Sequence, residues 1–155
     1  MPGASYFAYG SNMDEELIAE RCPSATDPRP GRLDEFRLEF NVYSDLWGGG
    51  AANLEPDNGS FVWGVVWQVE PADFKHLDTF SGHPTFYRRE RVVVQTDDGA
   101  VECMTYRVAH QRGYVRPTEE YLNRVRAAIT HHGLPDEALD ILDRAARPPS
   151  PHIST

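Results

Sequence analysis

The chain has 155 residues, of which 40% are hydrophobic and 11% aromatic, as is typical of one folded globular domain. Its formal net charge is −9 at pH 7, which argues against a nucleic-acid partner or an anionic membrane surface, because both require a basic patch. No signal peptide and no membrane-spanning apolar run is visible, and Cys22 and Cys103 match no metal or redox spacing. We therefore expect a cytoplasmic protein with two reduced thiols in or near its core.

The first half of the chain predicts mainly strands. In chain order we expect a strand over 6–9, a short helix over 14–20, a loop marked by Pro28, Pro30 and Gly31, a strand over 36–41, a turn over 56–59 and a strand over 61–69. The last of these, FVWGVVWQV, is almost wholly apolar and predicts a central strand covered on both faces. Gly64 within it indicates that another backbone or a ligand approaches closely there.

The second half adds helices around a hairpin. We expect a helix that begins at Pro71, two strands over 88–95 and 101–108 joined by a turn over 97–99, a helix capped by Thr118 and ended by Gly133, and a last helix from Pro135. The pattern predicts one α+β domain over 1–147, with a closed or strongly curved sheet and helices packed outside it. The Pro- and Ser-rich segment 148–155 is expected to be a mobile tail.

The segment YFAYGSN, residues 6–12, ends in a turn rich in hydrogen-bond donors. Gly10 permits unusual backbone angles, and consecutive N–H groups in such a turn can bind an anion. Ser11 and Asn12 add side-chain donors. A small carboxylate suits this turn better than a triphosphate, since no Lys or Arg is nearby in the sequence. The alternative is that Ser11 and Asn12 only cap the helix that follows.

Four stretches carry a resemblance to a known family. YFAYGSNM, FVWGVVWQV, LDTFSGHPTFYRRERVVV and PTEEYLNRVRAAITHHGLP, in this order over roughly residues 6–135, resemble the γ-glutamylcyclotransferase family, which includes AIG2-like proteins and γ-glutamylamine cyclotransferases. The resemblance implies a small mixed β-barrel with flanking helices and a cavity at one end. It also implies that Tyr9, Gly10, Ser11 and Asn12 hold the α-carboxylate and α-amino end of a γ-glutamyl group.

The family reaction, as the resemblance implies it, needs no cofactor. The α-amine of the substrate attacks its own γ-carbonyl, closes 5-oxoproline and expels the attached amine or amino acid. Holding the tethered nucleophile in a folded conformation supplies much of the acceleration. One group must also take a proton from the amine and return one to the leaving nitrogen.

The sequence departs from the family pattern at this proton-transfer group. The family's acid/base glutamate lies in a segment of the form Leu-Asp-x-x-Glu-Gly, and here the segment from Leu77 to Gly82 has Ser81 at that position. A serine hydroxyl without an adjacent base is no proton acceptor near pH 7. Loss of such a group typically lowers the rate by about 10²- to 10⁴-fold. The usual mechanism is therefore in doubt for this chain.

Other residues could take over proton transfer. His83 titrates in the useful range and could act alone or as a base for Ser81, although an exposed loop histidine is the favoured interpretation. Asp78 could reach the pocket mouth, or it could be a solvated charge on the helix. Glu55 and Glu90 are weaker candidates, because carboxylates in strands and turns usually face water.

Several further residues have two possible roles. Tyr87 and Tyr121 could donate to a carbonyl oxygen in the pocket, or they could be core aromatics with hydroxyls at the surface. His131 and His132 fit an interaction with a helix end better than a metal site, so no metal is expected. The triple glycine over 48–50 could allow a ligand to approach, but a flexible turn is the favoured interpretation.

Three functional hypotheses follow. The first is an enzyme, a lyase or acyltransferase of the γ-glutamylcyclotransferase type, with an altered acid/base residue. The second is a different tailoring step in biosynthesis, such as amide cleavage or acyl transfer, with Ser81 and His83 as catalytic residues. The third is a catalytically silent binder. In each case we expect a small amino-acid-derived ligand, no nucleic acid, no membrane, no cofactor, and a monomer or homodimer.

Overall fold

The computed structural model describes residues 3–81, 87–108 and 113–149. The strands are β1 (Ala4–Ala8), β2 (Thr26–Ser44), β3 (Gly49–Val69), β4 (Arg88–Thr96) and β5 (Gly99–Arg107). The helices are α1 (Glu15–Arg21), α2 (Phe74–Ser81), α3 (Glu119–His131) and α4 (Asp136–Ala146), with short 3₁₀ turns η1 (Ser11–Met13) and η2 (Pro71–Asp73). The tail segment 150–155 lies outside the described residues.

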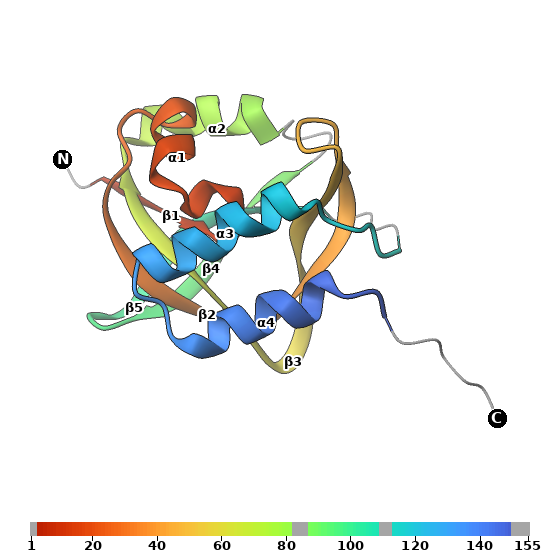
Figure 1. Cartoon of the computed structure of the whole chain (residues 1–155). Helices are drawn as coiled ribbons and strands as arrows, with labels where there is room; N and C mark the ends of the chain where they lie inside the picture. Colours follow the sequence, from red (N-terminus) through yellow and green to blue (C-terminus); the bar gives the residue numbers. More distant parts are fainter. Residues whose placement is uncertain (1–2, 82–86, 109–112, 150–155) are drawn as a thin grey trace.

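The five strands form a closed barrel in the order β1-β3-β2-β4-β5. The pairs β1–β3, β2–β3, β2–β4 and β4–β5 are antiparallel, whereas β1 and β5 are parallel and close the barrel at Tyr6 and Met104. Figure 1 shows α3 and α4 crossing one face of the barrel, with α1 and α2 packed above them. The expected small mixed barrel with flanking helices is therefore confirmed.

The predicted central strand is part of β3, which pairs with β1 on one side and β2 on the other. A Cβ atom at Gly64 would lie 2.4 Å from the Ala8 carbonyl oxygen and 2.7 Å from the Phe7 ring. The glycine is therefore required by a close backbone approach, as the sequence predicts, and the approaching group is protein backbone.

Two predicted breaks are wrong, because they lie inside long strands. The expected loop at Pro28 to Gly31 is part of β2, and the expected turn over 56–59 is part of β3. The register between β2 and β3 shifts near both segments, and Glu35 and Gly59 have positive φ angles there. The turn-forming residues thus make bulges that curve a continuous strand rather than ending it.

The helix ends follow the sequence signals. The Thr118 side chain accepts a hydrogen bond from the Tyr121 amide at 3.2 Å and caps α3, and Gly133 follows its end with a φ of +70°. Asp14, rather than Ser11 or Asn12, caps α1 by accepting from the Leu17 amide at 3.0 Å. The capping alternative for Ser11 and Asn12 is therefore wrong, because both residues lie within η1, before Asp14.

The triple glycine has two structural roles. Gly48 lies in the β2–β3 turn with a φ of +69°, as the turn interpretation predicts. Gly49 and Gly50 instead begin β3, where a Cβ at Gly50 would lie 2.0 Å from the Val115 carbonyl oxygen.

Cys22 and Cys103 are free and buried, which confirms the two thiols. In the described part of the chain, no helix has both the length and the apolarity needed to span a membrane.

Candidate active site

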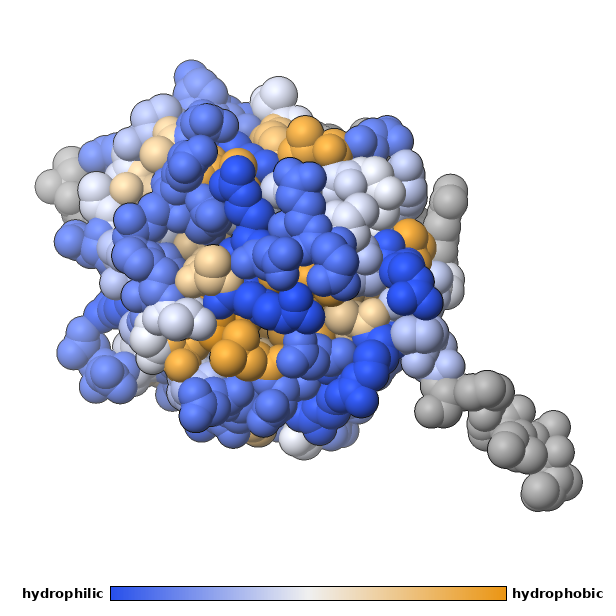
Figure 2. Space-filling model, in the orientation of Figure 1, coloured by the Kyte–Doolittle hydropathy of each residue, from blue (hydrophilic) through white to orange (hydrophobic). Residues whose placement is uncertain are grey.

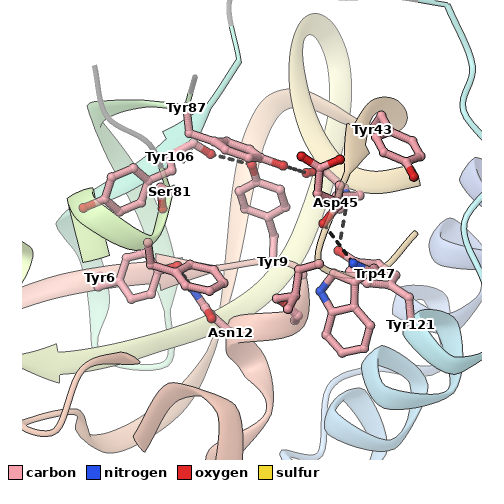
Figure 3. A pocket seen from close by; sticks show the side chains of 17 residues that line it. Tyr6, Tyr9, Asn12, Tyr43, Asp45, Trp47, Ser81, Tyr87, Tyr106 and Tyr121 are labelled. Atoms are coloured by element: carbon pink, nitrogen blue, oxygen red, sulfur yellow. Dashed lines mark hydrogen bonds between the residues drawn. The ribbon is translucent and has the colours of Figure 1, made fainter. Parts of the chain in front are cut away.

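A pocket of about 420 Å³ lies between the loop after β1, the β2–β3 turn and the end of α2. Its lining comprises Tyr9–Asn12, Tyr43–Trp47, Ala51, Ala52, Phe80, Ser81 and the tyrosines at 6, 87, 106 and 121 (Figure 3). Six of the seven tyrosines of the chain therefore line this one pocket. The walls are aromatic, and the polar atoms that they present are mainly hydroxyl groups.

The loop after β1 is held by an arginine that the sequence did not place there. Arg21 Nη1, at the end of α1, donates to Asn12 Oδ1 at 2.6 Å and to Ser11 Oγ at 3.0 Å. Asn12 Nδ2 donates to the Tyr6 hydroxyl at 2.9 Å, and Trp67 Nε1 donates to the Asn12 carbonyl at 3.0 Å. The expectation of a loop without a nearby cation is wrong, because α1 folds back and brings Arg21 behind the loop.

Gly10 makes room for a tyrosine hydroxyl. A Cβ at position 10 would lie 2.8 Å from the Tyr121 oxygen, while the Gly10 φ of −129° is not left-handed. The Tyr121 oxygen accepts a hydrogen bond from the Ala52 amide at 3.1 Å. In the described residues no acceptor is seen for the Tyr121 proton, so the hydroxyl can donate to an oxygen placed in the pocket.

The pocket tyrosines are proton donors, not bases, at neutral pH. Burial raises the pKa of Tyr6 to about 12, and burial is also the main reason that the pKa values of Tyr9, Tyr87 and Tyr121 lie above the usual value. Burial, reinforced by a hydrogen bond to Asp78, raises the pKa of Tyr106. All five hydroxyls therefore stay protonated when an amine substrate would need a proton acceptor.

The tyrosine hydroxyls also form hydrogen bonds that link separate elements of the barrel and α2. Tyr9 donates to the Tyr106 carbonyl, and Tyr87 donates to the Ala52 carbonyl at 3.3 Å. Tyr106 donates to the Asp78 carboxylate, which is also 3.4 Å from Arg89 Nη1. Asp78 thus lies behind Tyr106 rather than in the pocket lining, and neither the pocket-mouth interpretation nor a solvated helix charge describes it.

The other carboxylate candidates lie away from the pocket. Glu55 is only 6% exposed and accepts a hydrogen bond from Asn41 at 3.0 Å, so the expectation that it faces water is wrong. Glu90 forms an ion pair with Arg107. The carboxylate that does line the pocket is Asp45, in the β2–β3 turn, which sequence reasoning missed.

The two adjacent histidines lie outside the pocket lining, at the end of α3. His131 Nε2 lies 3.2 Å from Glu15 Oε1, and His132 Nε2 lies 2.8 Å from the Met13 carbonyl oxygen. Together with Glu15 they bring three ligand-type atoms within 4.8 Å of one another on a largely exposed surface. These contacts are with α1 and η1, so they link α3 to the N-terminal segment.

Comparison with known proteins identifies the family. Residues 6–124 match the sequence model of the family described as "Gamma-glutamyl cyclotransferase, AIG2-like". The chain belongs to this family. The resemblance expected from the four sequence stretches is therefore confirmed.

Relatives and solved structures agree with this assignment. The chain is 34% identical over 138 residues to the gamma-glutamylcyclotransferase of Bos taurus, and the match covers 85% of this chain and 73% of that protein. The Homo sapiens protein of the same name is 33% identical over 138 residues. A solved structure of a gamma-glutamyl cyclotransferase superposes with a TM-score of 0.86 at 32% identity, covering 96% of this chain and 90% of that one. A yeast cyclotransferase specific to glutathione, with a TM-score of 0.66 and 13% identity, shares the fold.

The structure brings almost all of the predicted site residues to one pocket. Tyr9–Asn12, Ser81, Tyr87 and Tyr121 all line it, although their roles toward a ligand stay predictions. His83 lies outside the described residues. Tyr43, Asp45 and Trp47 were missed, because a short turn between two strands gives no local sign that it folds over a distant loop.

Proposed function

We propose that this protein is a γ-glutamylcyclotransferase-type enzyme that acts on a γ-glutamyl amine or amide and releases the amine together with 5-oxoproline. The observation that carries the proposal is the convergence of the Tyr9–Asn12 loop, position 81, Tyr87 and Tyr121 on one pocket. These segments are far apart in the chain, and a reaction on a γ-glutamyl group would use them together. Cytoplasmic location and a monomeric or homodimeric state stay predictions.

The α-carboxylate of the substrate binds at the loop after β1. Gly10, Ser11 and Asn12 line the pocket there, the Ser11 hydroxyl can donate its own proton, and Arg21 behind them supplies a positive charge. Burial lowers the pKa of Arg21 below its usual value, but a guanidinium remains charged in proteins. The loop is thus suited to one carboxylate without a direct salt bridge from the pocket wall.

Cyclisation is supported by the size and polarity of the pocket. A space of about 420 Å³ accommodates a folded γ-glutamyl group, in which the α-amine lies against the γ-carbonyl. The Tyr121 hydroxyl, whose proton has no acceptor among the described residues, is the donor for the oxyanion that develops on that carbonyl. The nitrogen–carbon bond to the leaving amine then breaks as the five-membered ring closes.

Proton transfer is the altered part of this mechanism. By the sequence resemblance, Ser81 stands where the family has its acid/base glutamate; it lines the pocket, and the neighbouring tyrosines hold their protons at neutral pH. We therefore expect a slower reaction than one assisted by a glutamate at this position, by about 10²- to 10⁴-fold. Ser81 and His83 are the candidates at the α2 end for the remaining proton transfer.

The test is direct detection of the product. The purified protein is incubated with a panel of γ-glutamyl amides, amines and amino acids, and 5-oxoproline is measured by mass spectrometry. We expect time- and enzyme-dependent 5-oxoproline with at least one member of the panel. Its absence at high enzyme concentration, with folded protein, would remove the proposal.

A second candidate function is supported by Ser81 itself, which lines the pocket although it is no carboxylate. A serine in this place, paired with His83, fits amide cleavage or acyl transfer on a small amino-acyl metabolite, or a pocket that only binds such a molecule. Ser81→Ala distinguishes these readings. It abolishes turnover in the serine mechanism and leaves ligand binding intact in the silent binder.

A further inference from the structure

The pocket has opposite charges at its two ends. Arg21 lies behind Ser11 and Asn12, whereas Asp45 lies in the turn between β2 and β3. In Figure 3, Asn12 and Asp45 lie on opposite sides of Tyr9, with aromatic rings between them. A ligand that is anionic at one end thus meets a positive charge at that end of the pocket and a negatively charged carboxylate at the other.

Asp45 is the charged side chain of the pocket wall. Within the described residues it is the one acidic or basic side chain that lines the pocket, and no ion pair or side-chain hydrogen bond to its carboxylate is seen there. The turn places it at the mouth, where it is exposed to solvent. A carboxylate in this position can bind a cation without first giving up a protein partner.

The mouth of the pocket is also apolar. In the described part of the chain the large hydrophobic side chains that remain exposed are Tyr43 at 46%, Leu46 at 62%, Phe80 at 46% and Val93 at 55%, and the first three line the pocket. Figure 2 shows apolar side chains at the surface near the end of α2, one of several apolar areas on this face. Exposed apolar side chains around the opening of one pocket indicate that the opening contacts an apolar part of a ligand.

Aromatic rings and a carboxylate together form a recognised cation site. Trp47 packs edge-on against Tyr121, with ring centroids 5.3 Å apart, and so holds the turn against the pocket. Tyr43, near the end of β2, and Asp45 and Trp47, in the turn that follows, all line the pocket. Ring faces attract an ammonium group and also contact its methylene chain, which a carboxylate alone does not.

We propose that the group expelled from the γ-carboxyl is an amine with an apolar stem and a second, positively charged nitrogen. This inference rests on the proposed function, since it names the class of leaving group for that site. The γ-glutamyl head occupies the Tyr9–Asn12 end, the stem lies along Leu46 and Phe80, and the cation meets Asp45, Tyr43 and Trp47. The net charge of −9 also favours the approach of a cationic substrate.

The decisive experiment compares two substrates of the same length. γ-Glutamyl-(4-aminobutyl)amide ends in an ammonium group, and γ-glutamyl-n-pentylamide ends in a methyl group at the same position. We expect a kcat/KM preference of about threefold to thirtyfold for the ammonium substrate, which corresponds to an exposed ion pair with aromatic contacts. The preference should reside in KM and should shrink in 1 M salt, where charges are screened.

Two matched variants assign the preference to Asp45. Asp45→Asn should lower kcat/KM for the ammonium substrate to the value for the pentylamide. It should leave kcat/KM for the pentylamide unchanged. Asp97→Asn, an equivalent change in the exposed turn between β4 and β5, should keep the full preference. Equal kcat/KM values for both substrates with the unmodified protein would overturn the inference. An equal fall in kcat for both with Asp45→Asn would also overturn it, and would instead place Asp45 in proton transfer.

Binding separates this inference from the proposed function. If no member of the γ-glutamyl panel, these two amides included, yields 5-oxoproline, the cyclotransferase proposal fails, and calorimetric titration of both amides then decides the inference. Tighter binding of the ammonium compound that is lost in Asp45→Asn supports it. Equal dissociation constants, or no binding of either amide at millimolar concentration, would overturn it.

Discussion

The guanidinium of Arg21 donates to Asn12 Oδ1 at 2.6 Å and thereby fixes the loop that follows β1. The same nitrogen donates to Ser11 Oγ, and the guanidinium carbon lies 3.8 Å from the centre of the Phe80 ring at the end of α2. One side chain thus connects the Tyr9–Asn12 loop with the wall that carries Ser81. It also gives the loop a positive charge that the local sequence lacks.

Arg21→Gln should weaken binding of a γ-glutamyl ligand about tenfold, because one charge-assisted interaction contributes roughly 1.5 kcal/mol or more. Calorimetry with the free ligand measures this. The effect should fall on the α-carboxylate, so a ligand with a carboxamide there should lose little. Arg91→Gln, in an exposed pair with Glu102, is the control and should bind as the unmodified protein does. Unchanged affinity in Arg21→Gln would remove Arg21 from ligand binding.

Ser81→Glu should raise the rate of 5-oxoproline formation by about a hundredfold or more, because it places a proton acceptor at the family's acid/base position. The rate is followed with saturating γ-glutamyl substrate. Ser81→Gln has nearly the same shape without the charge and should give no gain. A folded Ser81→Glu protein without any increase would argue that the pocket serves a different reaction.

Tyr121→Phe should lower the free energy of unfolding by about 1–2 kcal/mol, since the buried Ala52 amide loses its acceptor. It should also lower kcat, because the transition state loses the hydroxyl that donates to the developing oxyanion. Tyr114→Phe removes a hydroxyl that donates to the Ala146 carbonyl, outside the pocket lining. That variant should lose stability alone, and an equal fall in kcat in both variants would contradict the role of Tyr121.

Gly64→Ala should lower the free energy of unfolding by about 3 kcal/mol, because the new methyl group meets the Ala8 carbonyl and the Phe7 ring. Denaturant unfolding followed by tryptophan fluorescence measures the change. Gly113→Ala is the matched control, since a Cβ there meets nothing within 4 Å and the backbone is not left-handed. Similar losses at both positions would show that glycine entropy, not the close approach in the barrel, sets the cost.

Alkaline pH should destabilise the fold above about pH 10. Burial raises the pKa of Tyr6 to about 12, whereas a tyrosine in the unfolded chain titrates near 10. The folded state therefore keeps a proton that the unfolded state releases, so this stability is intact below pH 10 and is lost as pH rises toward 12. The loss from Tyr6 alone is roughly 3 kcal/mol. Absorbance at 295 nm should show five tyrosines, those at 6, 9, 87, 106 and 121, ionising only on unfolding; ionisation near pH 10 in the folded state would contradict this.

Sequence reasoning succeeded where the signal is local. Thr118 before α3, Gly133 after it and the apolar run around Gly64 were all interpreted correctly, because caps and close-packed strands need particular residues. The same reasoning failed at Pro28 to Gly31 and at 56–59, where turn-forming residues make bulges within β2 and β3. A bulge and a turn need the same residue types, and only pairing with a neighbouring strand distinguishes them.

The sequence by itself determined the family, the barrel class and the serine at position 81, because these depend on residue identity and on the order of motifs along the chain. Only the tertiary structure decided that Arg21 supports the Tyr9–Asn12 loop, that Glu55 is buried and that Asp45 lines the pocket. Those positions depend on how the barrel closes and how its bulges turn β2 and β3. Closure brings together side chains that no local pattern relates.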